Sequence, residues 1–390
     1  MNEQITQNTN YYNSPGGQQV HQFSIALIEG DGIGPEVVQQ SVNVLNAIAE
    51  TFHHKFNYTS CLMGAIAIDQ TGNPLPDQTI HTCLKSDAIL FGAIGHPKYD
   101  NDPNAKVRPE QGLLKLRKSL QLFANIRPVT TYHALQHLSP LKPANTSGVD
   151  FIIYRELTGG IYFGTKELSA DGNTASDGCT YNREEIERIA TLAFQSAQKR
   201  RNKLTLVDKA NVLETSRLWR KVVKEMATNY PAVTVEYMFV DNAAMQLILN
   251  PKQFDIILTE NLFGDIISDE ASVITGSLGL LPSASVGNGV ALFEPIHGSY
   301  PQAAGKDIAN PLGSILSAAM MLNHLGLHKE AALVQEAVAW SLSSGYVTKD
   351  IDPFNYYSCS TVGDLIAAYI TGQHPQMKQH TIEAGRSTII

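Results

Sequence analysis

Apolar runs alternate with segments of helical periodicity along most of this chain. Runs rich in branched apolar residues, typical of buried strands, occupy residues 23–28, 87–94, 149–157, 204–209, 234–241 and 254–261. Segments in which apolar residues recur every three or four positions occupy 35–52, 112–124, 183–200, 310–326 and 330–345. Asn182 and Glu185 form a capping pair before the third of these segments. The alternation predicts an α/β protein, and 390 residues are enough for two domains.

A glycine-rich turn, from Gly30 to Pro35, follows the first predicted strand. A dinucleotide fingerprint needs a third glycine where this chain has Pro35, and an acidic strand end about 20 residues later. The chain has neither feature, since Glu50 lies inside a predicted helix. The turn therefore predicts a tight strand-to-helix connection in a fold that is not a Rossmann fold.

Acidic residues suggest a site for a divalent cation. Asp265 and Asp269 lie four residues apart in a segment of helical character, so they share one face. Asp241 and Lys209 follow the ends of other predicted strands, as does Asn261, and ligands gather at such ends in α/β sheets. Hard cations prefer carboxylate oxygens, but an isolated acidic pair is more often a solvated helix face. The pattern alone leaves a metal site and a solvated face about equally open.

Cationic and aromatic residues suggest an anionic substrate and proton transfer. Arg117, Arg127 and Arg155 could grip carboxylates, since guanidinium groups bind them in a bidentate manner. Tyr162, between glycines, is either a structural aromatic or a proton donor. Lys209 is either a solvated strand end or, beside carboxylates, a proton relay.

The composition of the chain limits the classes of binding partner and the cell compartment that we expect. The formal charge of −8 and the absence of a basic stripe argue against nucleic-acid binding, and no apolar run reaches the roughly 20 residues that cross a bilayer. The four cysteines form no metal-binding spacing, and the polar, Asn- and Gln-rich residues 1–22 lack a signal core. We therefore expect reduced thiols, a cytoplasmic location, a disordered segment over 1–22 and a polar tail over 371–390.

Eight segments, in the same order, are similar to the decarboxylating β-hydroxyacid dehydrogenases, the family of isocitrate and isopropylmalate dehydrogenases. They are GDGIGPEV, RPEQGLLKLRKSLQLFANIRP, YRELTGGIYFG, DKANVL, VDNAAMQL, TENLFGDIISDEAS, LFEPIHGS and AGKDIANP. One such string is weak evidence, but eight in order, within about 23–370, are a very specific signal. The resemblance implies oxidative decarboxylation of (2R,3S)-3-isopropylmalate to 4-methyl-2-oxopentanoate with reduction of NAD, in leucine biosynthesis.

The resemblance also implies a two-domain, isopropylmalate dehydrogenase-like fold, non-Rossmann, with a dimerisation arm. Residues 23–122 and 276–370 would form a discontinuous cofactor-binding domain. Residues 123–275 would form the substrate and dimerisation domain, with the arm at about 160–182. The active form would be a homodimer with shared active sites.

Site roles follow from the same resemblance. Carboxylates of the substrate would be held by Arg117, Arg127 and Arg155, and its isopropyl group would contact Leu113, Leu114 and Val212. Mg2+ or Mn2+, which chelates the substrate, would be bound by Asp241, Asp265 and Asp269. Lys209 would take up the hydroxyl proton and Tyr162 would protonate the carbon that loses CO2. In the family, the equivalents of Lys209 and Asp241 reach the site from the other subunit.

The positions that match NAD contacts in the family are Glu110, Glu294, His297, Gly298, Ser299, Tyr300, Gln302, Ala303 and Asn310. NAD-using relatives commonly carry aspartate and isoleucine where this chain has Gln302 and Ala303. Glutamine can bond to the ribose hydroxyls, but it does not repel a 2′-phosphate, so the strictness of the preference stays open. The lysine and tyrosine of NADP-dependent relatives are absent, and we expect NAD.

Three other functions compete with this interpretation. A sibling enzyme would act on tartrate, D-malate or a methylmalate, but Leu113 and Leu114 favour a branched alkyl group. A non-catalytic regulatory subunit would have lost a metal aspartate, Lys209 or Tyr162, and all are present. A general α/β metal-binding module explains the aspartates but leaves the three arginines unexplained.

Overall fold

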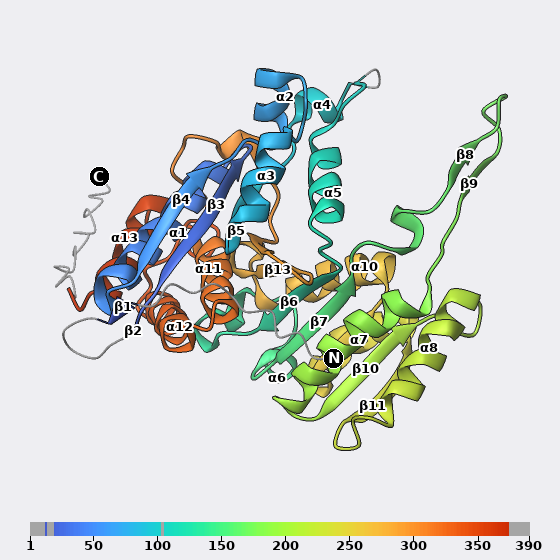
Figure 1. The fold of residues 1–390 in the computed structure, drawn as a ribbon. Helices are drawn as coiled ribbons and strands as arrows, with labels where there is room; N and C mark the ends of the chain where they lie inside the picture. The colour runs from blue at the N-terminus through green and yellow to red at the C-terminus, as the bar shows by residue number, and fades with distance from the viewer. Residues whose placement is uncertain (1–11, 14–18, 103–104, 374–390) are drawn as a thin grey trace, which may run out of the picture.

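The computed structural model describes residues 12–13, 19–102 and 105–373 (Figure 1). Among these residues, ten strands form one sheet in the order β11-β10-β12-β7-β6-β13-β14-β5-β3-β4. In chain order the strands are β3 (Gln22–Gly30), β4 (Lys55–Ser60), β5 (Ala88–Ala93), β6 (Ala124–Thr130), β7 (Asp150–Glu156), β10 (Lys203–Asp208), β11 (Thr234–Phe239), β12 (Ile256–Thr259), β13 (Pro282–Val286) and β14 (Ala291–Pro295). The α/β class is confirmed.

The sheet has two parallel halves joined by an antiparallel centre. β4, β3, β5 and β14 are parallel on one side, and β7, β12, β10 and β11 are parallel on the other. Between them, β13 pairs antiparallel with both β14 and β6, and β6 pairs antiparallel with β7. A Rossmann sheet is mostly parallel, so this centre agrees with the non-Rossmann prediction. It also brings residues near position 125 beside residues near position 284.

Helices cover both faces of the first half of the sheet. They are α1 (Gly34–Phe52), α2 (Ala65–Thr71), α3 (Asp77–Lys85), α4 (Pro97–Asp100), α5 (Pro109–Ser119), α11 (Leu312–His324), α12 (His328–Ser343) and α13 (Cys359–Ile370). Ile25 and Leu27 of β3 pack in the main core with α1 and α11, while Ala26 and Ile28 pack with α3 and α5. This alternation follows from the two-residue period of a strand.

The second half is covered in the same way by α7 (Arg183–Gln198) and α8 (Glu214–Ala227) on one face, and by α9 (Val240–Leu249) and α10 (Asn261–Ser272) on the other. Leu204 and Leu206 of β10 pack with α7 and α8, whereas Val207 packs with α9 and α10. The predicted capping pair before α7 is confirmed, since the Glu185 N–H donates to Oδ1 of Asn182 and the Asn182 N–H donates to Oε2 of Glu185. The short helix α6 (Pro143–Thr146) lies between β6 and β7 in the chain.

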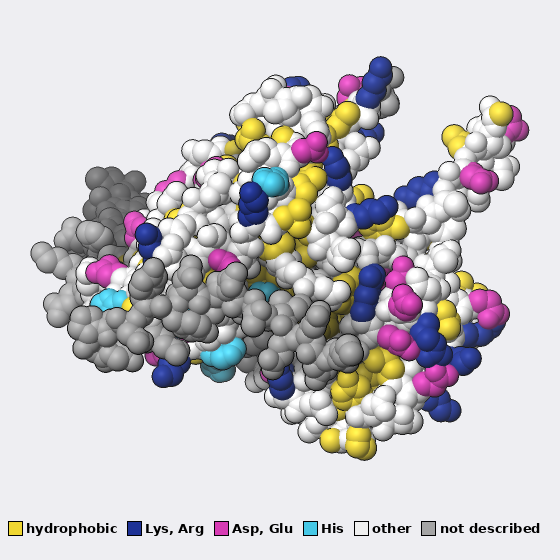
Figure 2. All heavy atoms as spheres, in the orientation of Figure 1, with side chains coloured by type: hydrophobic (Ala, Val, Ile, Leu, Met, Phe, Trp, Pro, Cys, Tyr) yellow, Lys and Arg dark blue, Asp and Glu magenta, His cyan; other side chains and the backbone are white. Residues whose placement is uncertain are grey.

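A hairpin leaves the body between β7 and α7. Its strands, β8 (Lys166–Leu168) and β9 (Ala175–Asp177), pair antiparallel and expose every residue. Figures 1 and 2 show that the hairpin stands clear of the rest of the molecule. It lies within the segment that the sequence predicts to be an arm.

The structure differs from the sequence-based expectations in several elements. The helix expected to reach residue 124 ends at Ser119, because Gln121 has a left-handed φ of 53° and the chain turns into β6. The strand expected to reach Asp241 ends at Phe239, and Asp241 lies in the first turn of α9, where acidic side chains are favoured. β13 was not predicted, since its sequence, PSASV, has only one β-branched residue.

The termini are described only in part. Within 1–22, Tyr12–Asn13 (β1) pairs with Gln19–Val20 (β2), and most of the other residues predicted to be disordered lie outside the described ranges. Of the predicted tail, only residues 371–373 are described. No helix in the described ranges has the length and apolar character to cross a membrane.

Candidate active site

One face of the central strands carries polar side chains where an apolar core would be expected. Asn125 and Arg127 alternate along β6 and so share a face, and Arg155 of β7 lies opposite Asn125 in the register. On the same face, Val129 and Ile153 continue into the apolar cluster beneath α9 and α10. The two arginines therefore point toward the side of the sheet that α10 covers.

Asp265 and Asp269 share one face of α10, at the four-residue spacing read from the sequence. Arg127 Nη1 donates to Oδ1 of Asp269 at 2.8 Å, and its Nη2 lies 4.0 Å from Oδ1 of Asp265. Arg155 Nη1 also donates to Asp265. The cations from β6 and β7 thus offset the repulsion between two like charges on one helix.

The third arginine, Arg117, reaches the same region from α5. Its Nη2 donates to Oε1 of Glu294, on β14, at 2.9 Å, and both side chains are largely buried. Its Nε is buried and has no hydrogen-bond partner among the described residues. An unpaired buried donor of this kind costs about 1–3 kcal/mol, so an acceptor on a ligand would be favoured there.

The electrostatics of Arg155 show that the three guanidinium groups are close together. Burial lowers the pKa of Arg155 to about 10, Asp265 opposes this shift, and the positive charges of Arg127 and Arg117 add to it. Arg155 stays charged at neutral pH. Three cations gathered from α5, β6 and β7 form a binding surface for a molecule with more than one carboxylate.

Tyr162 ends a short 3-10 turn, η2 (Gly160–Tyr162), beside the two acidic residues of α10. Its hydroxyl donates to Oδ2 of Asp265 at 2.7 Å, and its ring centroid lies 5.7 Å from the guanidinium carbon of Arg155. Burial raises the pKa of Tyr162 to about 12, and the bond to Asp265 adds to the shift. The hydroxyl therefore keeps its proton at neutral pH.

Lys209 and Asp241 form a separate pair at the ends of β10 and β11. Lys209 Nζ donates to Oδ1 of Asp241 at 2.6 Å, and the Val212 N–H donates to the Lys209 carbonyl at 2.9 Å. Within the described parts of one chain, no hydrogen bond or ion pair links Lys209 or Asp241 to the acidic residues of α10. One chain therefore brings together two of the three predicted metal ligands and leaves Asp241 with Lys209.

The residues predicted to contact the isopropyl group lie in two places, beside Arg117 and beside Lys209. Leu113 and Leu114 precede Arg117 on α5, where Leu113 packs against an apolar cluster and Leu114 is exposed. Val212 is also exposed, but it follows Lys209 in the turn after β10. Apolar residues thus accompany both the arginine side and the lysine side of the candidate site.

The glycine turn after β3 supports the loop predicted to bind the cofactor. The Ile33 N–H donates to the Ser299 carbonyl at 2.8 Å, and Ser299 Oγ donates to the Gly95 carbonyl at 2.7 Å. A Cβ on Gly32 would lie 1.9 Å from the Ser299 oxygen, and one on Gly95 would lie 3.1 Å from Oε1 of Glu110. The small residues allow this close approach and place Glu110 beside the loop.

Two positions in this loop suit contact with a ligand, one for its unpaired nitrogen and one for its free space. His297 Nε2 is buried without a partner among the described residues, and its Nδ1 lies 2.9 Å from the Gly298 carbonyl. Burial lowers the pKa of His297, so the ring is neutral at pH 7. A Cβ on Gly298 would meet nothing within 4 Å. A neutral imidazole nitrogen without a partner suits a hydrogen bond to an uncharged polar group.

The other predicted cofactor residues differ in exposure. Tyr300, with a left-handed φ of 38°, and Gln302 are exposed. Ala303 is buried in a small cluster with Ile33. The Asn310 side chain accepts from the Leu312 N–H at 3.0 Å, at the start of α11, and donates to Asp350 at 3.0 Å.

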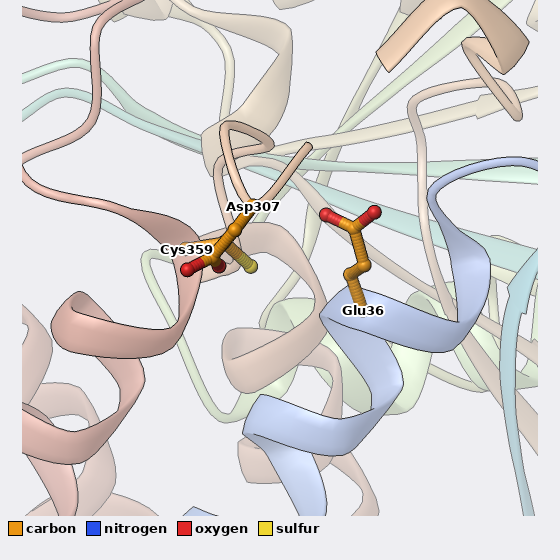
Figure 3. Close-up of side chains that lie close together, drawn as sticks. All are labelled: Glu36, Asp307 and Cys359. Carbon is orange, nitrogen blue, oxygen red and sulfur yellow. The ribbon is translucent and has the colours of Figure 1, made fainter. Parts of the chain in front are cut away.

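A second acidic group includes Asp307 of the cofactor loop (Figure 3). The carboxylates of Glu36 and Asp307 and the Cys359 thiol lie within 4.8 Å of one another. Burial raises the pKa of Cys359, and the two acids raise it further, so the thiol keeps its proton and is a poor metal ligand. Asp307 accepts from the Ser360 N–H at 2.8 Å, and Glu36 accepts from the Gly305 N–H. These bonds attach the cofactor loop to α1 and to the start of α13.

Two amides in this region hold site arginines; Asn125 was not predicted from the sequence, and Asn261 was predicted only as a residue at a strand end. Asn125 Oδ1 accepts from Arg127 Nε at 2.8 Å, and Asn261 Oδ1 accepts from Nε and Nη2 of Arg155 at 3.1 and 2.8 Å. Asn261 also donates to the Gly159 carbonyl, next to the Tyr162 turn, at 3.1 Å. An amide inside an apolar run is a usable signal, because a buried amide must find partners.

Comparison with known proteins agrees with this arrangement. Residues 24–366 match the family model described as isocitrate/isopropylmalate dehydrogenase. The chain is 54% identical over 350 residues to the 3-isopropylmalate dehydrogenase of Bacteroides fragilis, which covers 89% of this chain and 99% of that protein. It is 55% identical over 338 residues to the 3-isopropylmalate dehydrogenase of Priestia megaterium, covering 85% of this chain and 91% of that protein.

Solved structures show the same fold. The crystal structure of isocitrate dehydrogenase from Methylococcus capsulatus has a TM-score of 0.80 at 33% identity and covers 90% of this chain and 99% of that one. A beta-decarboxylating dehydrogenase from Thermococcus kodakarensis has a TM-score of 0.75 at 37% identity and covers 90% of this chain and 96% of that one. The chain therefore belongs to the isocitrate/isopropylmalate dehydrogenase family and is a decarboxylating dehydrogenase.

Proposed function

We propose that this enzyme oxidises and decarboxylates 3-isopropylmalate to 4-methyl-2-oxopentanoate with reduction of NAD, in leucine biosynthesis. The observation that carries the proposal is the joint presence of three guanidinium groups, two carboxylates and a protonated tyrosine over one face of the sheet. The identity of more than half of the aligned positions to 3-isopropylmalate dehydrogenases supports this substrate. Leu113 and Leu114, beside Arg117, suit a branched alkyl group.

The residues present fit the two cofactors. Asp265 and Asp269 offer the oxygen ligands that Mg2+ or Mn2+ prefers, with Asp241 of the partner subunit as the third. The residues that would form the NAD site are Glu110, Glu294, His297, Gly298, Ser299, Tyr300, Gln302, Ala303 and Asn310. Among them, His297 Nε2 has no hydrogen-bond partner in the described residues and could form one with the cofactor. When bound, these groups supply hydride acceptance and Lewis-acid stabilisation of negative charge.

The side chains of the enzyme would bind the substrate and transfer its protons. Arg117, Arg127 and Arg155 hold the two carboxylates and fix the orientation of the carbon that is oxidised. Lys209 of the partner subunit, in its neutral amine form, would accept the proton of the substrate hydroxyl during oxidation and become an ammonium. Tyr162 donates its proton to the carbon that loses CO2, from a hydroxyl that Asp265 holds in place.

An exposed apolar surface supports a homodimer with shared sites. This surface lies on α9, α10 and the 3-10 turn η4 (Val273–Thr275). Its side chains, each 47–63% exposed, are Met245, Ile248, Leu249, Ile266 and Val273. Asp241 precedes Met245 by four residues and Ile248 by seven, so it shares their face of α9. A second copy packed on this surface would carry Asp241 and Lys209 toward the neighbouring subunit. The arm at 160–182, with Leu168 exposed, would add to the same contact.

The proposal also covers the division into domains and the location of the enzyme in the cell. Residues 23–122 with 276–370 would bind the cofactor, and residues 123–275 would bind the substrate and the partner, with the antiparallel centre of the sheet as the junction. All four cysteines are free, which is usual in a reducing compartment, and we assign the enzyme to the cytoplasm.

One assay tests the function. Purified enzyme is given 3-isopropylmalate, isocitrate, tartrate or D-malate, each with NAD or NADP and Mn2+, and the reduced cofactor is measured. We expect the highest kcat/KM with 3-isopropylmalate and NAD, and slow turnover of close alkyl homologues, because apolar selection is weak. A higher kcat/KM for tartrate or D-malate would assign the chain to a sibling activity.

A further inference from the structure

The three site arginines are held in place by different buried partners. Arg117 is paired with the carboxylate of Glu294, whereas Arg127 and Arg155 each donate through Nε to a neutral amide, Asn125 and Asn261 respectively. Arg127 lies on β6, at the junction between the two halves of the sheet, and its Nη1 also donates to Ser268 Oγ at 2.7 Å and to Oδ1 of Asp269 at 2.8 Å.

Asn125 is fixed by the strand next to it. It is 1% exposed, and its Nδ2 lies 2.8 Å from Ser283 Oγ, 3.3 Å from the Ala284 carbonyl and 3.3 Å from Ser285 Oγ. All three acceptors belong to β13, which pairs with β6 in register. With Nδ2 bound to β13, the amide can turn only Oδ1 toward Arg127, which donates to it at 2.8 Å.

The neutrality of this partner has a consequence for binding. An amide oxygen orients a guanidinium group without cancelling its charge, whereas a carboxylate does both. We propose that Asn125 is a positioning residue that fixes the Nε side of Arg127 for a substrate carboxylate and adds no further negative charge to that of Asp269, which already pairs with Arg127. The inference rests on the proposed function, in which Arg127 binds that carboxylate.

The first test is a double-mutant cycle. Asn125→Ala should raise KM for 3-isopropylmalate by about ten- to hundredfold, the usual cost of losing a hydrogen bond to a charged group, with little change in kcat. In an Arg127→Lys background, where the Nε–H is gone but the charge remains, the same substitution should change KM by less than about threefold. Asn57→Ala, which removes a strand asparagine of β4 whose side chain bonds only to the Phe23 carbonyl among the described residues, serves as the control and should stay near wild type. Equal effects of Asn125→Ala in both backgrounds would overturn the proposal.

The second test does not depend on turnover. In the enzyme without substrate, the Arg127 Nε–H should exchange slowly with solvent in NMR spectra, and Asn125→Ala should remove that protection. Asn125→Asp keeps the acceptor and the volume, so it should retain protection even if the alanine variant folds poorly. Fast exchange in wild type, or loss of protection in the aspartate variant, would contradict the positioning role. If wild type shows protection but does not turn over 3-isopropylmalate, the proposed function fails and the positioning role stands.

Discussion

The hydroxyl of Tyr162 donates a hydrogen bond of 2.7 Å to Oδ2 of Asp265. Asp265 also accepts from Arg155, so a proton donor and a carboxylate-binding cation meet at one side chain. The two elements that supply them, η2 and β7, are joined by a short loop whose Gly159 carbonyl accepts from Asn261. This connection couples the position of the proton donor to that of the cation that would hold the substrate.

Replacement of Tyr162 by Phe should therefore impair chemistry more than binding. The ring can still pack against Arg155, but the proton donor is lost, and kcat should fall by roughly 10²- to 10⁴-fold with KM nearly unchanged. Steady-state kinetics with 3-isopropylmalate measure both terms. Tyr154→Phe, whose side chain packs on the opposite face of β7, is the control and should keep its kcat. A Tyr162→Phe enzyme with normal kcat would exclude the tyrosine as the donor.

Asp265→Asn tests the metal site. The substitution keeps the shape of the side chain but removes one of the two charges on this face of α10. We expect the Mn2+ concentration for half-maximal activity to rise roughly ten- to hundredfold. Glu270→Gln, a neutralisation on the same helix outside the site, should leave that concentration unchanged. An unaltered Mn2+ dependence in Asp265→Asn would speak against ligation by this residue.

Shared sites can be tested by complementation between two inactive variants. Lys209→Ala should lose nearly all turnover as a homodimer, and Asp265→Asn should do so when Mn2+ is kept well below its raised requirement. If Lys209 serves the site of the partner subunit, a mixed dimer contains one site with both residues intact and one site with neither. Half of the dimers are mixed after random exchange, so activity should return to about a quarter of wild type. No recovery, with exchange verified by mass spectrometry, would mean that each subunit uses its own lysine.

Much of this site could be predicted from local sequence patterns. The spacing of Asp265 and Asp269 and the strand ends before Lys209 and Asp241 depend only on helix and strand periodicity. The bond between Arg117 and Glu294 joins residues 177 positions apart, so it follows from the sheet order and from no local pattern. The small residues of β13 give a weak strand signal. Without β13, neither the strand order of the sheet nor the hydrogen bonds of Asn125 could be predicted.

Cofactor preference should respond to residue 302. Gln302 is exposed on the loop predicted to meet the adenosine ribose, and an aspartate there would repel a 2′-phosphate. A charge pair about 4 Å apart in water interacts by about 1 kcal/mol, so Gln302→Asp should raise the ratio of kcat/KM for NAD over NADP by about five- to tenfold. Gln302→Asn, which has the same shape as aspartate without its charge, should leave the ratio near wild type. An unchanged ratio in the aspartate variant would show that this position does not discriminate.

Stability at alkaline pH should depend on Tyr132, which packs against the main core. Burial raises the pKa of Tyr132 to about 12, while a tyrosine in the unfolded chain titrates near 10. The contribution of Tyr132 is fully present below pH 10 and is lost as pH rises toward 12, because the unfolded chain releases the proton first. In that window Tyr132 should make the free energy of unfolding fall by up to roughly 1.4 kcal/mol per pH unit. Urea unfolding of wild type and Tyr132→Phe at pH 9, 10.5 and 11.5 measures the difference. Tyr132→Phe should lose stability less steeply, and parallel curves for the two proteins would show that Tyr132 does not set the alkaline limit.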